Sequence, residues 1–239
     1  MFLFKIIYNN CHHYARYLYV NFFFLKSMKK NIIIFGSSGH AQEILECVQN
    51  KKKIYNFLGF VEKKSIYNKN KKKIYCYDND IKKLSKNNIF GIVGIFDLIK
   101  RKRIVKKILS INPNFKFISI ISKSSLISKK TIIGKNVFIA NGVIVNSNSI
   151  IKDHSVINTG SIIEHDCILN NYVNISPNCT ILGNTIISDE VSVGAGTVIK
   201  QNIKIEKNNI IGANSFVNKN IKSKNKIFFG NPAKFYEKK

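Results

Sequence analysis

One histidine of this chain stands where it could act as a base in a group-transfer reaction. His165 lies between two carboxylates in the run Ile163-Glu164-His165-Asp166-Cys167. Transfer of an acyl group from a thioester to an amine or hydroxyl needs a base that takes the proton of the nucleophile, and imidazole titrates near neutrality. The same run also describes an exposed surface histidine beside two solvated acids. The residues alone leave both interpretations open.

The element that must position His165 is a repeat of six residues. Every sixth residue from Ile121 to Val217 is aliphatic, without exception or change of register. This period is neither helical nor that of an alternating strand, and it is typical of a parallel β-helix, in which short strands stack around an aliphatic core. His165 follows the inward anchor Ile163 by two positions, so we expect its side chain to point away from that core.

The residues before the repeat follow an α/β pattern. The apolar run Asn31–Phe35 suits a buried parallel strand, and the glycine turn Gly36-Ser37-Ser38-Gly39-His40 leads into a helical pattern. A strand, a glycine turn and a helix place backbone N–H groups where anions bind well. The turn lacks the third glycine of a dinucleotide-binding fingerprint, so NAD binding is not predicted. Further strands are expected at Leu58–Glu62 and Ile89–Ile95, with a helix capped by Asp97 that reaches Leu109.

The repeat resembles the left-handed β-helix of the hexapeptide-repeat acyltransferases, and the domain order narrows the likeness. From Met28 to about Lys234 the chain is similar to the family of sialic acid O-acetyltransferases and nucleotide amino-sugar N-acetyltransferases. The resemblance rests on Gly36-Ser37-Ser38-Gly39-His40, Gly59-Phe60-Val61-Glu62, Asn158-Thr159, Ile163-Glu164-His165-Asp166-Cys167 and Gly230-Asn231-Pro232-Ala233-Lys234. It implies a Rossmann-like α/β domain at residues 28–112. An all-β left-handed parallel β-helix with a C-terminal tail would then follow at residues 113–239.

The resemblance also implies an activity. In that family the small domain holds a nucleotide sugar, and the β-helix holds acetyl-CoA between neighbouring subunits of a trimer. The chain would thus be a homotrimeric, acetyl-CoA-dependent N-acetyltransferase acting on a nucleotide-linked amino sugar in the synthesis of a bacterial surface glycan or glycoprotein. His165 would be the general base and Asp166 its orienting partner. The implied sugar-nucleotide contacts are Gly36, Ser37, Ser38, Gly39, His40, Glu62 and Asn158. From the residues alone, His40 could equally cap the helix or lie at the surface, and Glu62 could simply be solvated.

Three hexads per coil would stack residues that are eighteen positions apart. Gly183 would then lie one coil above His165 and leave room for a pantetheine thioester. A second column of small residues, Pro177, Ala195 and Ala213, has the same spacing. In the family the positions that match Gly183, Ala195 and Ala213 lie along acetyl-CoA, although the turns of any β-helix favour small residues.

At Asn174 the sequence departs from the family pattern. Many relatives carry a second histidine there, near the carbonyl of the thioester. An Asn amide can still donate a hydrogen bond to a developing oxyanion, so Asn174 remains a candidate contact for the cofactor.

Three other functions compete with this interpretation. The first is O-acetylation of a sialic acid or related sugar, in which only the acceptor differs. A metal-dependent hydrase on the same β-helix would need about three His ligands. The repeat contains only His154 and His165, so no metal is predicted. A non-catalytic binding module is the third, because β-helices also serve as inert scaffolds.

Composition excludes some partners and suggests others. The formal net charge is +26, and nearly all basic residues are Lys, scattered among Asn and Ile. Nucleic-acid binding would show clustered Arg and Lys with aromatics on a recognisable module, so it is not predicted. The positive field favours small polyanions such as a nucleotide sugar or coenzyme A. Five Cys without CxxC spacing fit a reducing cytoplasm.

The first 27 residues differ from everything that follows. They are aromatic-rich and irregular, and their best apolar run, Phe22–Leu25, is far too short to span a bilayer. They also lack the long apolar core of a signal peptide. We therefore interpret residues 1–27 as a non-native or disordered extension, with Met28 as the true initiator, and we expect no membrane span.

Overall fold

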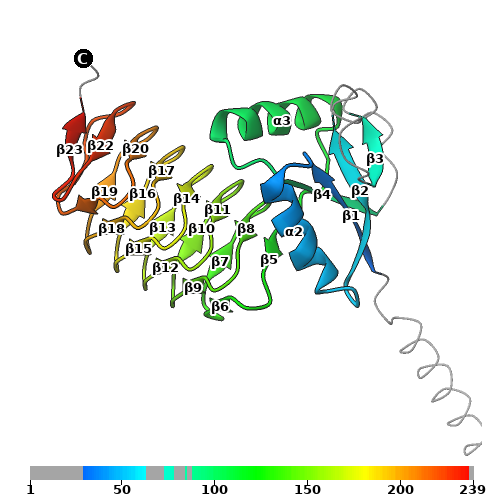
Figure 1. Ribbon diagram of the computed structural model, residues 1–239, viewed down its shortest axis with the longest axis horizontal. Coiled ribbons are helices and arrows are strands. Elements are labelled where there is room, and N and C mark those ends of the chain that lie inside the picture. The colour runs from blue at the N-terminus through cyan, green and yellow to red at the C-terminus, as the bar shows by residue number, and fades with distance from the viewer. Residues whose placement is uncertain (1–28, 63–72, 78–83, 85–87, 237–239) are drawn as a thin grey trace, which may run out of the picture.

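The protein has two parts, an α/β domain and a long β-helix (Figure 1). The structure is a computed structural model that describes residues 29–62, 73–77, 84 and 88–236. The interpretation of residues 1–27 as an extension lies outside this range. The α/β domain covers the first coils, and the described chain ends at the opposite end of the β-helix (Figure 1).

The α/β domain contains a parallel sheet of four strands in the order β3-β2-β1-β4. Its elements are β1 (Lys30–Phe35), α2 (Gly39–Gln49), β2 (Tyr55–Glu62), β3 (Ile74–Tyr77), β4 (Ile89–Val93) and α3 (Leu98–Ile111). Alternate residues of β1 serve the two faces of the sheet, because successive side chains of a strand point in opposite directions. Ile32 and Ile34 lie on the face of the sheet that helix α2 covers, whereas Ile33 and Phe35 lie on the face that helix α3 covers.

Both helices begin where the sequence predicts. Asp97 caps α3, since its Oδ1 accepts a hydrogen bond from the Lys100 backbone N–H at 2.8 Å. The predicted strands at residues 31–35, 58–62 and 89–95 correspond to β1, β2 and β4. The Rossmann-like class of this domain is therefore confirmed.

The β-helix is a prism with three faces, each a parallel sheet of very short strands. Face one contains β5 (Ile120–Ile121), β8 (Phe138–Ile139), β11 (Val156–Ile157), β14 (Asn174–Ile175), β17 (Ser192–Val193), β20 (Ile210–Ile211), β22 (Ile227–Phe229) and the antiparallel β23 (Lys234–Tyr236). Face two contains β6 (Leu126–Ile127), β9 (Ile144–Val145), β12 (Ile162–Ile163), β15 (Thr180–Ile181), β18 (Val198–Ile199) and β21 (Phe216–Val217). Face three contains β7 (Ile132–Ile133), β10 (Ile150–Ile151), β13 (Ile168–Leu169), β16 (Ile186–Ile187) and β19 (Lys204–Ile205).

The register of the prism confirms the predicted stacking. Ile163 pairs with Ile181, and Ile181 pairs with Ile199, so each anchor lies over the one eighteen residues earlier. These anchors are completely buried. At roughly 2 kcal/mol for each buried aliphatic side chain, the stack supplies the main stabilisation of the prism.

The corners of the prism use residues that tolerate left-handed backbone. Positive φ values occur at Asn148, Asp166, Asn184 and Asn202, which occupy one corner in successive coils. Asn and Asp visit this conformation more readily than other side chains because a short polar group can bond locally. The Asn-rich composition of the repeat is therefore partly a requirement of its turns.

The α/β domain is fixed to the prism by polar contacts. The Val93 backbone N–H donates to Asn136 Oδ1 at 2.8 Å, and Lys102 forms an ion pair with Glu190 at 2.6 Å. On the α2 side, Thr159 Oγ1 donates to Glu43 Oε1 at 3.3 Å. These contacts join both helices of the domain to the coils that carry the predicted site. No helix in the described part of the chain is long and apolar enough to cross a bilayer.

Candidate active site

His165 and Asp166 lie together on the corner between faces two and three. His165 Nδ1 is 2.8 Å from Asp166 Oδ2, and the two side chains are 61% and 49% exposed. The second carboxylate oxygen, Oδ1, accepts a hydrogen bond from Asn148 Nδ2 at 3.1 Å. The sequence predicted Asp166 as the partner of His165, and the structure brings the two side chains into contact.

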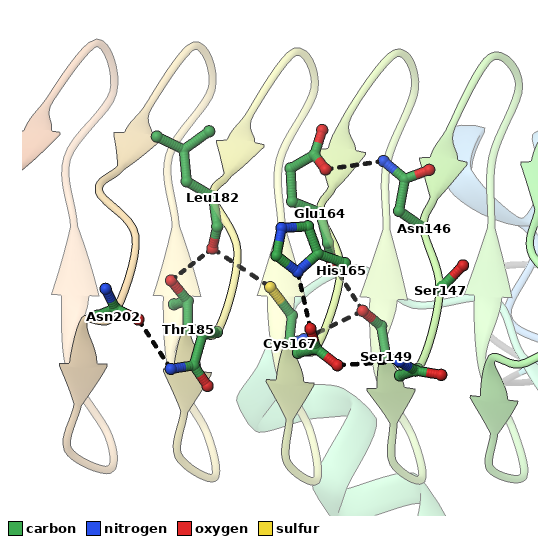
Figure 2. A network of polar contacts seen from close by, with 12 residues as sticks. Asn146, Ser147, Ser149, Glu164, His165, Cys167, Leu182, Thr185 and Asn202 are labelled. Carbon is green, nitrogen blue, oxygen red and sulfur yellow. Dashed lines mark hydrogen bonds and ion pairs between the residues drawn. The ribbon is translucent and has the colours of Figure 1, made fainter.

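The backbone of this corner is held from both neighbouring coils. Ser149 Oγ donates to the Glu164 carbonyl at 2.7 Å and accepts from the Cys167 N–H at 3.1 Å, so one hydroxyl spans the turn (Figure 2). The Asp166 N–H donates to the Ser147 carbonyl, and the His165 carbonyl accepts from the N–H of Asn184, each at 3.0 Å. The exposed pair therefore stands on a turn that is hydrogen-bonded to the coils on both sides.

The backbone of Gly183 lies against the imidazole of His165. A Cβ added at Gly183 would lie 2.8 Å from both Cε1 and Nε2 of His165, well inside van der Waals contact. Any larger residue here would therefore displace the ring from its observed position. The predicted stacking of Gly183 on His165 agrees with this arrangement.

The two acids beside His165 have different partners. Glu164 turns away from the ring, and its Oε2 accepts from Asn146 Nδ2 at 3.0 Å (Figure 2). Asp166 contacts the imidazole instead. The pKa of its carboxyl is lowered, mainly by the hydrogen bond with His165 and to a smaller extent by that from Asn148. Asp166 therefore stays ionised and can hold the Nδ1–H tautomer, which leaves a lone pair on Nε2.

Cys167 is close in sequence to His165 but points into the core. Its Sγ contacts the Leu182 carbonyl at 3.3 Å, and burial raises the pKa of the thiol to about 11. The thiolate is the nucleophilic form of cysteine. The protonated Cys167 is therefore unsuited to carry an acyl group, and direct attack on a thioester is the simpler chemistry.

The small-residue column at Ala195 and Ala213 lies on a different corner, between faces one and two. Beside it, an open hollow of about 460 Å³ is lined by Gly196, Val198, Asn214, Ser215, Phe216 and Asn231. Face two separates this corner from the corner that carries His165. A ligand that touched both in one chain would have to cross face two, so the two predicted parts of the acetyl donor site are not adjacent within one subunit.

The structure differs from the expectation for Asn174. Its side chain is buried on face one, against the α/β domain. Its Nδ2 donates to the Phe96 carbonyl at 3.0 Å, and its Oδ1 accepts from the guanidinium of Arg101. Both polar atoms of the amide serve the domain interface, away from the His165 corner, and we assign no cofactor contact to Asn174.

In the α/β domain the predicted residues gather around the end of β1. Gly36 has φ +91, and an added Cβ there would meet Ile95 Cγ1 at 3.0 Å. Ser37 Oγ donates to Glu62 Oε2 at 2.8 Å, which joins the glycine turn to the end of β2. Ser38 is the N-cap of α2 and makes no side-chain cap bond, and Gly39 has open space where its side chain would be.

His40 and Asn158 are linked across the domain interface. His40 Nδ1 is 3.6 Å from Glu43 Oε2. Glu43 also accepts a hydrogen bond from the Thr159 hydroxyl. The backbone N–H of Thr159 in turn donates to Asn158 Oδ1 at 2.8 Å. The His40 ring is packed edge-on between Phe96 and Phe138. The glycine turn and the predicted Asn158 thus belong to one connected surface between the domains.

Two residues that the sequence analysis did not select contribute to this geometry. Asn148 could have been found, because it lies eighteen positions before Asp166 and therefore one coil below it. Arg101 could not, because its role depends on how the domains meet. It is completely buried and donates to the backbone carbonyls of His154, Ile95 and Phe96 as well as to Asn174.

The two parts together form a Rossmann-like domain followed by a left-handed parallel β-helix. Residues 31–108 match the family model of the PglD N-terminal domain. No curated protein sequence matches the chain significantly. In the described residues, no three His, Cys, Asp or Glu side chains are grouped as a metal site would require.

Solved structures show the same fold over most of the chain. The acetyltransferase domain of PglB from Neisseria gonorrhoeae has a TM-score of 0.78 at 23% identity, covering 87% of this chain and 100% of that one. A mutant of perosamine N-acetyltransferase from Caulobacter crescentus, in complex with CoA and GDP-perosamine, has a TM-score of 0.78 at 22% identity, covering 87% and 97%. WeeI from Acinetobacter baumannii has a TM-score of 0.77 at 22% identity, covering 86% and 99%. The fold that the sequence resemblance predicted is confirmed by these structures.

Proposed function

We propose that this protein is an acetyl-CoA-dependent N-acetyltransferase that acts on a nucleotide-linked amino sugar, with His165 as the general base. The observation that carries the proposal is the imidazole geometry. Nδ1 is held at 2.8 Å by the ionised Asp166, and Nε2 lies beside the bare backbone of Gly183. A base with one nitrogen fixed and the other open to an approaching substrate suits proton removal from an amine.

The proposed reaction transfers the acetyl group directly. The sugar amine attacks the thioester carbonyl carbon and forms the C–N bond, while His165 Nε2 takes a proton from the nitrogen. The C–S bond breaks, and the proton on Nε2 passes to the departing sulfur, which leaves as the thiol of CoA. Asp166 stabilises the imidazolium that exists between these two transfers.

The acceptor site is proposed at the glycine turn of the α/β domain. The first turn of α2 and the overall charge of +26 favour a diphosphate, and Ser37, Glu62 and Asn158 offer polar groups to the sugar or base. One structural relative is described in complex with GDP-perosamine, a nucleotide-linked sugar. Thr159 joins this surface to the corner between faces one and two, which is also the corner of Ala195 and Ala213.

The donor site is proposed between subunits of a homotrimer. The corner that carries His165 divides two rows of outward aliphatic side chains, Ile144 and Ile162 on face two and Ile150, Ile168 and Ile186 on face three. Packing of these rows in a closed threefold ring would bury them. The same packing could bring the Ala195 and Ala213 column of one subunit to the His165 corner of the next. A monomer in light scattering would contradict this arrangement.

We also place the reaction in the cytoplasm. Cys47, Cys167 and Cys179 form no disulfide, which fits a reducing compartment.

The test is acetyl-CoA-dependent release of thiol with a panel of nucleotide amino sugars and free sialic acids. His165→Ala should lose about 10²–10⁴-fold in kcat, the usual contribution of general base catalysis. Glu164→Gln is the matched control, because Glu164 is the other flanking acid and bonds Asn146 instead of the ring. Turnover with sialic acid alone would indicate O-acetylation. No turnover and no acetyl-CoA binding would refute the enzyme assignment.

A further inference from the structure

The corner that carries His165 also carries a column of amide and carboxylate side chains. Asn148, Asp166, Asn184 and Asn202 occupy it in successive coils, all with left-handed backbone. Two hydrogen bonds of the same kind run between coils, from Asn148 Nδ2 to Asp166 Oδ1 at 3.1 Å and from Asn184 Nδ2 to Asn202 Oδ1 at 2.8 Å. The first of these hydrogen bonds ends on Asp166, the partner of His165, and the second does not.

Asp166 differs from the other members of the column in charge and in its second contact. Oδ2 is engaged by His165 at 2.8 Å while Oδ1 is engaged by Asn148. A half-exposed carboxylate with one partner can rotate about its last bond, because this torsion is broad. A second donor on the other oxygen fixes the plane of the carboxylate. Hydrogen bonds to charged groups are about twice as strong as neutral ones, which suits this contact to the task.

We propose that Asn148 is a positioning residue for the reaction. Its amide holds Asp166 so that Oδ2 accepts the proton of His165 Nδ1, which keeps Nε2 unprotonated and directed at the space beside Gly183. The inference rests on the proposed function for its catalytic meaning, while the tautomer of His165 can be measured without any substrate. Asn148 does not touch the ring and acts through Asp166.

The experiment compares Asn148→Gly with Asn202→Gly in the full chain. Glycine accepts positive φ without strain, so both replacements remove a side-chain hydrogen bond and keep the turn. Asn202→Gly is the matched control, because it breaks the other bond of the column and leaves His165 and Asp166 unchanged. The two variants should have similar melting temperatures.

Two readouts separate positioning from a merely structural role. Imidazole ¹⁵N spectra, with His165 identified by the signals lost in His165→Gln, should show Nδ1–H as the main tautomer in the native protein and in Asn202→Gly. In Asn148→Gly that preference should weaken. In the acetyl transfer assay kcat should drop about tenfold in Asn148→Gly with little change in KM. Asn202→Gly should keep the native kcat.

The possible failures are distinguishable. Equal tautomer ratios of His165 in Asn148→Gly and the native protein would overturn the inference, whether or not acetyl transfer is detected. Equal kcat in the two glycine variants would also overturn it. If no acceptor is turned over while the tautomer shifts as expected, the positioning of the imidazole stands and the proposed reaction fails.

Discussion

Replacing Gly183 by alanine should separate activity from stability. The added Cβ would lie 2.8 Å from Nε2 and Cε1 of His165 and 3.3 Å from Nδ1, whereas carbon atoms pack comfortably at about 3.5–4.0 Å. The ring must move by roughly 1 Å. It is the end of a side chain that is 61% exposed, so it can swing into solvent at little cost. That movement breaks the 2.8 Å contact between Nδ1 and Asp166.

The size of the effect follows from the bond that is lost. Without its contact to Asp166 the imidazole loses its fixed tautomer and orientation, which is part of the roughly 10²–10⁴-fold that general base catalysis contributes. We therefore expect kcat for acetyl transfer to fall roughly 10- to 100-fold. Stability should change by less than about 1 kcal/mol. Gly183 lacks positive φ, so alanine also stiffens the unfolded chain without straining the folded one.

The assay pairs initial rates with urea unfolding of Gly183→Ala and Gly194→Ala. At Gly194 the new Cβ would meet the backbone nitrogen of Ala213 at 2.5 Å, and backbone cannot swing away. Gly194→Ala should therefore lose stability, which Gly183→Ala should keep. A Gly183→Ala protein with native kcat would refute the reasoning, because the imidazole would then not need its observed position. A large loss of stability would equally contradict it, since the ring would be rigidly held.

Two further predictions concern the domain interface. Arg101→Met should lower the free energy of unfolding by roughly 2–4 kcal/mol, because it leaves buried acceptors unpaired. Arg103→Met, on the exposed side of the same helix, should change the free energy of unfolding little. Equal urea midpoints for the two variants would contradict this prediction. Burial lowers the pKa of His154 to about 4, below its ordinary 6.5. The unfolded state then binds more protons between these values, so stability should be complete above pH 6.5 and decline toward pH 4. His154→Asn should lose that component of the pH dependence, and parallel stability curves for the two proteins would contradict the prediction.

The period of six predicted the prism because each anchor has one possible environment. A hydrophobic residue at every sixth position must face the same interior, so the stacking of Ile163 on Ile181 followed directly from counting. The contact between His165 and Gly183 followed from the same count. These features depend only on separations along the chain, which a sequence contains.

Features that depend on how two surfaces meet could not be predicted in this way. The period places Asn174 on an outward position but does not say that the α/β domain covers it, and its amide is engaged there by Arg101. Counting also leaves Glu164 and Asp166 equivalent as neighbours of His165. The left-handed turn at Asp166 distinguishes them, because it directs that carboxylate to the ring.

Because all coils have the same height, the coil that carries a side chain fixes the position of that side chain along the prism axis. Thr159, which contacts Glu43 of helix α2, and His165 belong to the same coil, so the proposed base lies at a fixed level along the axis relative to the glycine turn. A His-Asp pair transferred to the equivalent corner of another coil would move along the axis only in steps of about 4.8 Å, the spacing of neighbouring strands. In a scaffold of this kind, the distance between a bound nucleotide and the amine it carries is matched in whole coils, and new acceptor lengths arise by changing the coil that holds the base.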